Sequence, residues 1–246
     1  MSAVVVLHGF TGDAGTMEPI STRLPGEVET PNLAGHGPGP HPDDPSRYSV
    51  DAMAETVVAG HDGPVHLVGY SMGGRVALTV ACRFPDRVRS LSLIGASAGL
   101  ADPAERAARV EADDALAATI ESDPNGFVDR WMANPLFATQ ARLGPEFLAA
   151  ARAQRLGNEP RALARSLRAN STGRMRPLHD DLDRCVMPVG LIAGADDPKF
   201  VAIAHGLASR MPAAVVHVID GAGHAAHLEA PDAVVTAIVT TIERAS

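Results

Sequence analysis

The sequence predicts an α/β protein, in which a mostly parallel sheet is flanked by helices and a helical cap is inserted into the chain. Two observations lead to this fold class. Short apolar runs alternate with helical patterns over residues 1–99 and 178–246, as in parallel sheets that are buried on both faces. Residues 100–177 instead contain mainly alanine, arginine, glutamate and leucine at helical spacing, without a clear strand pattern.

The elements of the expected core follow one another in a regular order. The first expected strand is a β-branched, fully apolar run, and the later ones are short runs with a strand pattern. The strands are expected at residues 3–7, 28–33, 65–69, 88–94, 189–193 and 214–219. The helices are expected at residues 17–24, 50–59, 71–84, 200–211 and 231–242. Because helices separate consecutive strands, the strands should lie parallel in a doubly wound sheet.

The segment 100–177 is expected to form the helical cap. Proline removes a backbone donor and ends a helix, so the prolines of this segment should divide it into several short helices. These prolines are Pro124, Pro135, Pro145 and Pro160. We assign residues 1–99 and 178–246 to the core, and residues 100–177 to a cap without a separate function.

Composition limits the partners of the protein. The 246 residues are 46% apolar and carry a formal net charge of −8, which argues against nucleic-acid binding by phosphate neutralisation. A local basic pocket for a small anionic substrate remains compatible with this charge. The first residues lack the pattern of a signal peptide, and no apolar run is long enough to cross a bilayer. We therefore expect a cytoplasmic protein with no membrane contact and no obligate protein partner.

The strongest chemical signal is the run Gly-Tyr-Ser-Met-Gly-Gly at residues 69–74. It matches the pattern G-x-S-x-G between an apolar strand and a helix, the context in which a serine forms a nucleophile elbow. Gly69 and Gly73 should let strand and helix approach closely, and the helix N-terminus adds positive potential near the serine oxygen. The motif predicts that Ser71 is the reactive group.

A serine hydroxyl needs a histidine to take its proton and an acid to orient that histidine. In chains with this elbow the acid precedes the histidine. His224, in the loop after the last strand, is the predicted histidine, and His227 is the alternative. Asp197, in the run G-A-D-D-P-K-F, is the predicted acid, and Asp196 is the alternative.

The negative charge that develops on a substrate oxygen needs an oxyanion hole. The backbone amide of Phe10, in the loop L-H-G-F-T-G after the first strand, and that of Met72 after the serine are the predicted donors. His8 is expected to be structural. The spacing of His217, His224 and His227 matches no standard metal site, so we expect neither a metal nor another cofactor.

With these motifs the whole chain resembles the α/β-hydrolase fold. A narrower resemblance is to the 2-succinyl-6-hydroxy-2,4-cyclohexadiene-1-carboxylate synthases, the pyruvate-eliminating lyases of menaquinone biosynthesis. Besides the elbow, it is carried by R-L-G-N-E-P-R-A-L-A-R-S-L-R and S-T-G-R-M-R-P-L in the cap, and by G-A-D-D-P-K-F and G-A-G-H-A-A-H-L-E-A-P in the core. The two cap segments and the Lys-Phe pair after the acid are the more specific of these.

The resemblance implies which residues hold a substrate with several carboxylates. The family binds these groups with arginines, and the matching positions here are Arg75, Arg155 and Arg106, with Arg109 as the alternative to Arg106. Tyr70 and Trp131 match further pocket positions.

Two reactions are compatible with these residues. The resemblance implies a lyase in which Ser71 acts as a base. The alternative is a serine hydrolase, a carboxylesterase or C–C bond hydrolase, in which Ser71 becomes acylated.

Overall fold

One parallel sheet of six strands forms the centre of the computed structural model, which describes residues 2–245. The strands lie in the order β2-β1-β3-β4-β5-β6, and every neighbouring pair is parallel. Their bounds are β1 Val4–Leu7, β2 Val28–Glu29, β3 Val65–Tyr70, β4 Val88–Ile94, β5 Val189–Gly194 and β6 Ala214–Ile219. The strand order reverses at β1, and open α/β sheets bind ligands beside such a reversal, at the carboxyl ends of the strands.

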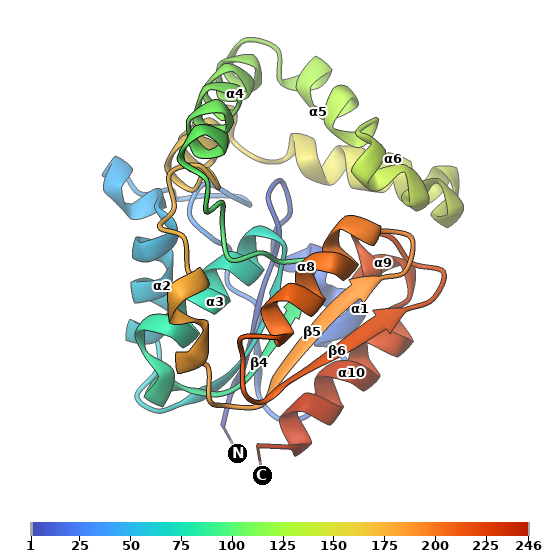
Figure 1. The fold of residues 1–246 in the computed structure, drawn as a ribbon. Coiled ribbons are helices and arrows are strands. Elements are labelled where there is room, and N and C mark those ends of the chain that lie inside the picture. The colour runs from blue at the N-terminus through green and yellow to red at the C-terminus, as the bar shows by residue number, and fades with distance from the viewer. Residues whose placement is uncertain (1, 246) are drawn as a thin grey trace.

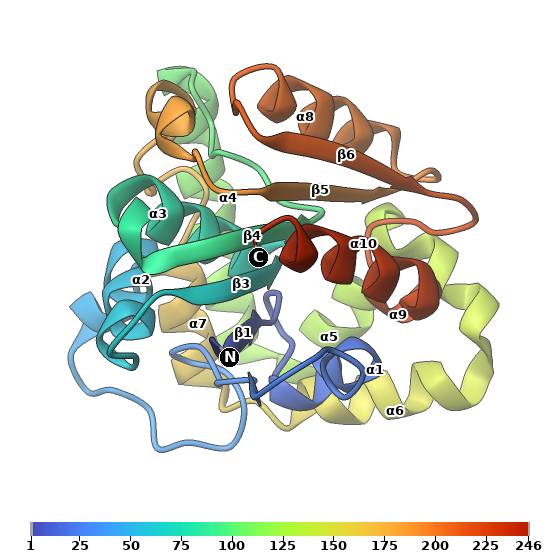
Figure 2. The ribbon, with the colours of Figure 1, turned by 90° about the horizontal axis from the view of Figure 1, so that it is seen from below.

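Helices cover both faces of the sheet (Figure 2). On one face lie α2 (Val50–Ala59), α3 (Met72–Arg83) and α8 (Pro198–Ala208), and on the other α1 (Glu18–Ser21) and α10 (Pro231–Glu243). Successive residues of β1 alternate between two apolar cores, because side chains along a strand point to opposite faces. Every β1 side chain is therefore buried, which explains its uninterrupted apolar sequence.

The segment between β4 and β5 is helical and lies over the carboxyl ends of the strands, on the side of the molecule away from both termini (Figure 1). Its helices are α4 (Pro103–Ser122), α5 (Pro124–Met132), the 3₁₀ helix η4 (Pro135–Leu143), α6 (Gly144–Leu156) and α7 (Pro160–Ala169). Each of the four prolines noted above lies at the first or second position of a helix, where proline loses no hydrogen bond. Their positions therefore mark the starts of helices.

Two elements differ most from the sequence-based prediction. The second strand was expected over residues 28–33 but has only two residues, Val28 and Glu29. Pro31 lacks an N–H to continue the ladder, and a loop rich in glycine and proline follows. The helix expected over residues 17–24 is divided into a 3₁₀ helix, Ala14–Met17, and the short α1.

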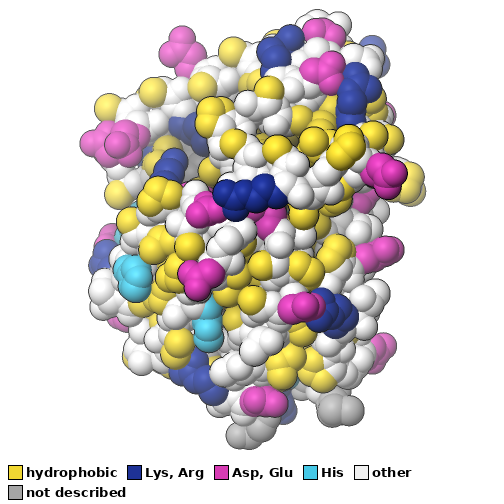
Figure 3. Space-filling model, turned by 90° about the vertical axis from the view of Figure 1, so that its right-hand side faces the viewer, with side chains coloured by type: hydrophobic (Ala, Val, Ile, Leu, Met, Phe, Trp, Pro, Cys, Tyr) yellow, Lys and Arg dark blue, Asp and Glu magenta, His cyan; other side chains and the backbone are white. Residues whose placement is uncertain are grey.

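Most arginines at the surface are paired with acidic side chains, and charges of both signs are interspersed on the face shown in Figure 3. These pairs include Arg23–Asp232, Arg83–Asp51, Arg142–Asp196, Arg152–Asp129, Arg168–Glu121, Arg174–Asp114 and Arg176–Asp181. Such exposed pairs contribute about 0–1 kcal/mol each to stability. Within residues 2–245, no helix has the length and hydropathy of a membrane span.

Candidate active site

Loops that follow four of the strands meet under the cap and carry predicted site residues. Phe10 follows β1, Ser71 follows β3, Asp197 follows β5 and His224 follows β6. A cavity of about 180 Å³ lies at this edge of the sheet, and Ser71, His224 and Phe10 line it together with the cap residue Trp131. The parallel topology thus assembles residues that are up to 214 positions apart, from 10 to 224, in one place.

Ser71 occupies a strained turn between β3 and α3. Its φ of 50° and ψ of −105° lie where residues with a Cβ are rarely found, a strain that typically costs about 1–3 kcal/mol. A Cβ on Gly73 would lie 2.4 Å from the Leu7 carbonyl oxygen, so this position requires glycine for the turn to pack against β1. The Ser71 hydroxyl does not cap α3, although serine at a helix start usually does, and it remains available to another partner.

That partner is His224. Its Nε2 lies 3.3 Å from Ser71 Oγ, and its Nδ1 lies 2.9 Å from Asp197 Oδ2. Burial by itself would raise the pKa of Asp197, but hydrogen bonds from His224 and the Phe200 amide bring it below its ordinary value. An ionised Asp197 accepts a hydrogen bond from the Nδ1–H of His224 and leaves Nε2 without a proton. This tautomer can take the serine proton.

The two alternatives, Asp196 and His227, lie elsewhere. Asp196 forms a hydrogen bond of 2.6 Å with Arg142 of the cap. His227 is buried against the ring of Tyr70, with 4.1 Å between ring centroids. Burial lowers the pKa of His227 to about 3, with a smaller contribution from His224, so the imidazole is neutral at pH 7. The geometry therefore distinguishes Asp197 and His224 from their neighbours.

The backbone amides of Phe10 and Met72, the predicted oxyanion-hole donors, are both free of backbone partners at the cavity among the residues described. Both residues line the cavity beside Ser71, and neither backbone N–H donates a hydrogen bond to another residue in the range 2–245. Met72 is the first residue of α3, so the helix dipole adds to its amide. His8 is structural, as expected, since its Nδ1 donates to the Gly9 carbonyl and its Nε2 accepts from the Leu33 amide.

Arg75 lies on the first turn of α3 and lines the same cavity. Only 9% of its surface is exposed, and its Nη1 donates to the Asn170 carbonyl over 2.6 Å. Burial, with a smaller contribution from the nearby charge of Arg109, lowers the pKa of Arg75 to about 10. In the described part of the chain no carboxylate forms an ion pair with this guanidinium, although the charge of the nearby Asp113 acts on it and opposes the lowering of its pKa.

The structure places Arg109, and not Arg106, at the cavity. The Nε of Arg106 donates to the Gly173 carbonyl over 3.1 Å, and its Nη2 donates to the Met175 carbonyl over 3.4 Å. Arg109 lines the cavity and pairs with the buried Asp113 through contacts of 2.9 Å. The choice of Arg106 from the sequence is therefore corrected to Arg109, because the chain leaving the cap engages Arg106.

A second cavity, of about 330 Å³, adjoins the first and contains Arg155 in its lining. Tyr70, Trp131 and Phe10 line both cavities, so these aromatic rings lie between them. The Nη1 of Arg155 donates to the Ala151 carbonyl, and burial brings the pKa of this arginine below its ordinary value. The Nε of Arg155 and the indole Nε1 of Trp131 are buried donors without a partner among residues 2–245.

Several site residues were not predicted from the sequence. Phe137 and Phe200 surround the histidine, with ring centroids 6.0 and 4.4 Å from that of His224. Lys199 and Asn170 also line the cavity. The Lys-Phe pair after Asp197 was noted only as a feature of the resemblance, although it provides the signal for Lys199 and Phe200. No comparable signal marks Phe137 or Asn170.

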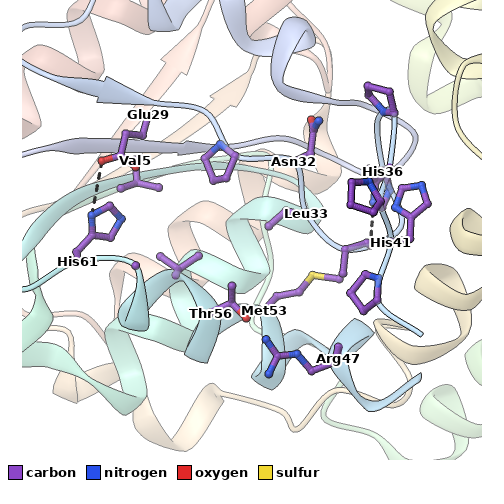
Figure 4. A pocket seen from close by; sticks show the side chains of 18 residues that line it. Val5, Glu29, Asn32, Leu33, His36, His41, Arg47, Met53, Thr56 and His61 are labelled. Atoms are coloured by element: carbon purple, nitrogen blue, oxygen red, sulfur yellow. Dashed lines mark hydrogen bonds and ion pairs between the residues drawn. The ribbon is translucent and has the colours of Figure 1, made fainter. Parts of the chain in front are cut away.

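Another cavity, of about 430 Å³, lies between α2 and the loop that follows β2 (Figure 4). His36 and His41 lie on one side of it and His61 and Glu29 on the other. None of Ser71, Asp197 and His224 lines this cavity, so it is separate from the candidate active site. Within residues 2–245, no three or more His, Cys, Asp or Glu side chains are grouped as metal ligands would be.

The chain belongs to the alpha/beta hydrolase family, whose family model matches residues 4–237. Over most of its length it is also similar to 2-succinyl-6-hydroxy-2,4-cyclohexadiene-1-carboxylate synthases. The synthase of Enterobacter sp. (strain 638) is 33% identical over an alignment of 240 residues, which covers 94% of this chain and 88% of that relative. A relative from Bacillus subtilis (strain 168), which bears the same name provisionally, is 35% identical over 93% of this chain and 86% of its own length.

Solved structures show the same similarity. MenH from S. aureus superimposes with a TM-score of 0.94 and 31% identity, covering 99% of this chain and 94% of its own. A thermophilic esterase from Thermogutta terrifontis gives a TM-score of 0.83 at 24% identity, covering 100% of this chain and 90% of its own. The second likeness shows the shared fold alone.

Proposed function

We propose that this protein is a lyase that eliminates pyruvate from 2-succinyl-5-enolpyruvyl-6-hydroxy-3-cyclohexene-1-carboxylate. The product would be 2-succinyl-6-hydroxy-2,4-cyclohexadiene-1-carboxylate, the compound in the names of the similar synthases. The observation that supports this reaction best is the pair of arginines in two adjoining cavities, the buried Arg75 in the cavity of Ser71 and the half-buried Arg155 in the other.

These arginines line the cavities without an acidic side chain bonded to them. Most surface arginines of the chain have an acidic partner, whereas Arg75 and Arg155 donate to backbone carbonyls, as Arg106 also does. A buried charge without a counterion is costly, and a substrate carboxylate would compensate it. Guanidinium groups bind carboxylates through two parallel hydrogen bonds, so each cavity is suited to one such group. A simple ester substrate would leave both charges uncompensated.

In the proposed reaction Ser71 acts as a base. Asp197 orients His224, and His224 accepts the serine proton, so Ser71 Oγ can remove the proton next to the succinyl ketone. The electrons of that C–H bond move to the ketone oxygen, and the Phe10 and Met72 amides stabilise the resulting enolate. The enolate then collapses, the ring C–O bond breaks, and the enolpyruvate leaving group takes up a proton to become pyruvate.

The alternative reaction is hydrolysis through an acylated Ser71. It uses the same serine, histidine and aspartate, and an esterase shares the fold. The two reactions differ in their intermediate, since the lyase forms no covalent bond to Ser71 whereas the hydrolase forms an acyl-serine. Arg75 and Arg155 favour the lyase, because acyl transfer from an uncharged ester gives them no role.

A pyruvate-release assay on the enolpyruvyl substrate, beside a panel of short-chain esters, tests the proposal. The wild-type protein should release pyruvate without accumulating a serine adduct, and Ser71→Ala should abolish the release. Mass spectrometry of the protein quenched during turnover detects an acyl-serine. Rapid ester hydrolysis with such an adduct, and no pyruvate, would establish the hydrolase instead.

A further inference from the structure

We propose that Asn158, in the turn between α6 and α7 of the cap, is a positioning residue for the oxyanion hole. Through this side chain the cap holds the loop that presents the Phe10 amide. The inference rests on the proposed function and adds a physical route by which the cap acts on the reaction.

The loop that carries Phe10 is a tight turn in an unfavourable conformation. The Gly12 amide donates to the Gly9 carbonyl over 3.1 Å, which makes Phe10 and Thr11 the central residues of a four-residue turn. Thr11 has a φ of 67°, a left-handed conformation that β-branched residues rarely adopt. Such a residue keeps this conformation only where its surroundings hold it, so contacts from outside the turn must contribute.

Asn158 supplies these contacts. Its Nδ2 donates to the Thr11 carbonyl over 3.0 Å, and its Oδ1 accepts from the Gly37 amide over 2.9 Å. Its side chain is buried, with a residue exposure of 5%, so both bonds are shielded from water. Gln154 adds a second, longer bond of 3.2 Å to the same Thr11 carbonyl. One amide group therefore joins the cap, the turn of Phe10 and the loop after β2.

The loop after β2 completes the support of Phe10. His36, next to Gly37, packs edge-on against the Phe10 ring, with 5.5 Å between centroids and an interplanar angle of 85°. Asn158 thus supports Phe10 by two routes. One is its bond to the Thr11 carbonyl in the turn, and the other is its bond to Gly37, next to the His36 ring that packs on Phe10. A displacement of about 1 Å in a reacting group can cost about 100-fold in rate, so loss of this support should reach the chemistry.

Asn158→Asp tests the role, because it removes the Nδ2 donor and keeps the size of the side chain and its Oδ1 acceptor. We expect kcat for pyruvate release to fall about 10- to 100-fold, while KM changes less than about threefold. The matched control is Asn32→Asp, which makes the same atomic change. Asn32 Oδ1 accepts a hydrogen bond from the Ala14 amide, which aspartate would retain, and Asn32 Nδ2 has no acceptor within residues 2–245. The kcat of Asn32→Asp should therefore stay within about twofold of wild type.

A second readout does not depend on the lyase reaction. An organophosphate, diethyl 4-nitrophenyl phosphate, phosphorylates an activated serine: Ser71 Oγ attacks phosphorus, His224 takes the proton, and 4-nitrophenolate leaves. Negative charge develops on the phosphoryl oxygen, so the rate depends on the oxyanion hole. The rate of labelling of Ser71, followed by mass spectrometry, should also fall about tenfold or more in Asn158→Asp.

The outcomes separate this inference from the proposed function. If wild-type protein releases no pyruvate, the proposed lyase fails, while slower labelling of Asn158→Asp still supports the positioning role. If kcat and labelling are unchanged, or fall only in proportion to the unfolded fraction measured by circular dichroism, the role is refuted. Should Asn158→Asp fail to fold, Asn158→Ser, which also removes the Nδ2 donor, should show a fall in the same two rates; unchanged rates there would refute the role.

Discussion

Replacing Asp197 by asparagine should nearly abolish activity without unfolding the protein. Asp197 Oδ2 accepts a hydrogen bond of 2.9 Å from Nδ1 of His224. This bond leaves Nε2, 3.3 Å from Ser71 Oγ, free to take up the serine proton. In Asp197→Asn, the side-chain oxygen of the asparagine still accepts the hydrogen bond from the Phe200 backbone amide that caps α8. The side-chain nitrogen of the asparagine therefore faces His224. That nitrogen donates to Nδ1 and moves the histidine proton to Nε2, which then cannot act as a base.

The expected loss is large because the histidine holds the wrong tautomer in an intact site. An equivalent change in a serine protease lowers kcat about 10⁴-fold, which corresponds to about 5 kcal/mol of transition-state stabilisation. Stability should change much less. Asparagine caps a helix about as well as aspartate, so the start of α8 is preserved.

Asp196→Asn is the matched control, since it makes the same change one residue away. Asp196 pairs with Arg142 at the surface, so its loss should cost at most about 1 kcal/mol of stability and leave kcat within about threefold. Pyruvate release by both variants, together with thermal unfolding, measures these effects. The reasoning is refuted if Asp197→Asn keeps more than a tenth of wild-type activity, or if Asp196→Asn is the variant that loses it.

Three further predictions concern charge, pH and packing. Arg155→Met should lower kcat/KM for pyruvate release roughly 10- to 100-fold, because a charged hydrogen bond to the substrate is lost. The control Arg152→Met, at the surface, should keep kcat/KM within about twofold of wild type. Equal effects of the two changes would refute a role of Arg155 in substrate binding. Burial lowers the pKa of His227 to about 3, so the unfolded chain binds more protons and stability falls as pH drops from about 6.5 towards 3. His227→Phe should reduce the dependence of Tm on pH between pH 7 and 4, and an unchanged slope would contradict this. Gly73→Ala should destabilise the protein by at least about 2 kcal/mol in urea unfolding, because the alanine Cβ would meet the Leu7 carbonyl. The control Gly206→Ala, on α8 where the new Cβ meets no other atom, should instead stabilise the protein by up to about 1 kcal/mol.

Much of the fold could be predicted from local patterns. The strands β4 and β6 and the helix α2 have the bounds predicted from the sequence, because their apolar spacing ends sharply at turn residues. The prediction was less accurate at the edge of the sheet. There β2 has one neighbour and only two residues, and Pro31 in the expected strand was a better guide to its length than the strand pattern of residues 28–33.

The site shows the same division. The elbow around Ser71 was predictable, since G-x-S-x-G between a strand and a helix requires a particular backbone turn. Arg106 and Arg109 were not distinguishable, because residues three apart lie on one face of a helix. The carbonyls of Gly173 and Met175, more than sixty residues away in the chain, engage Arg106 and leave Arg109 at the cavity.

The sequence by itself determined the class of fold, the position of the serine and the short lists of candidates for its histidine and acid. These properties depend on local spacing, which the chain carries wherever it folds. Only the tertiary structure showed that Asp197 and His224 contact each other, that His224 reaches Ser71, and that Arg109 rather than Arg106 lines the cavity. Neighbours in the chain share composition and local structure, and they differ only in the distant groups that packing brings to each of them.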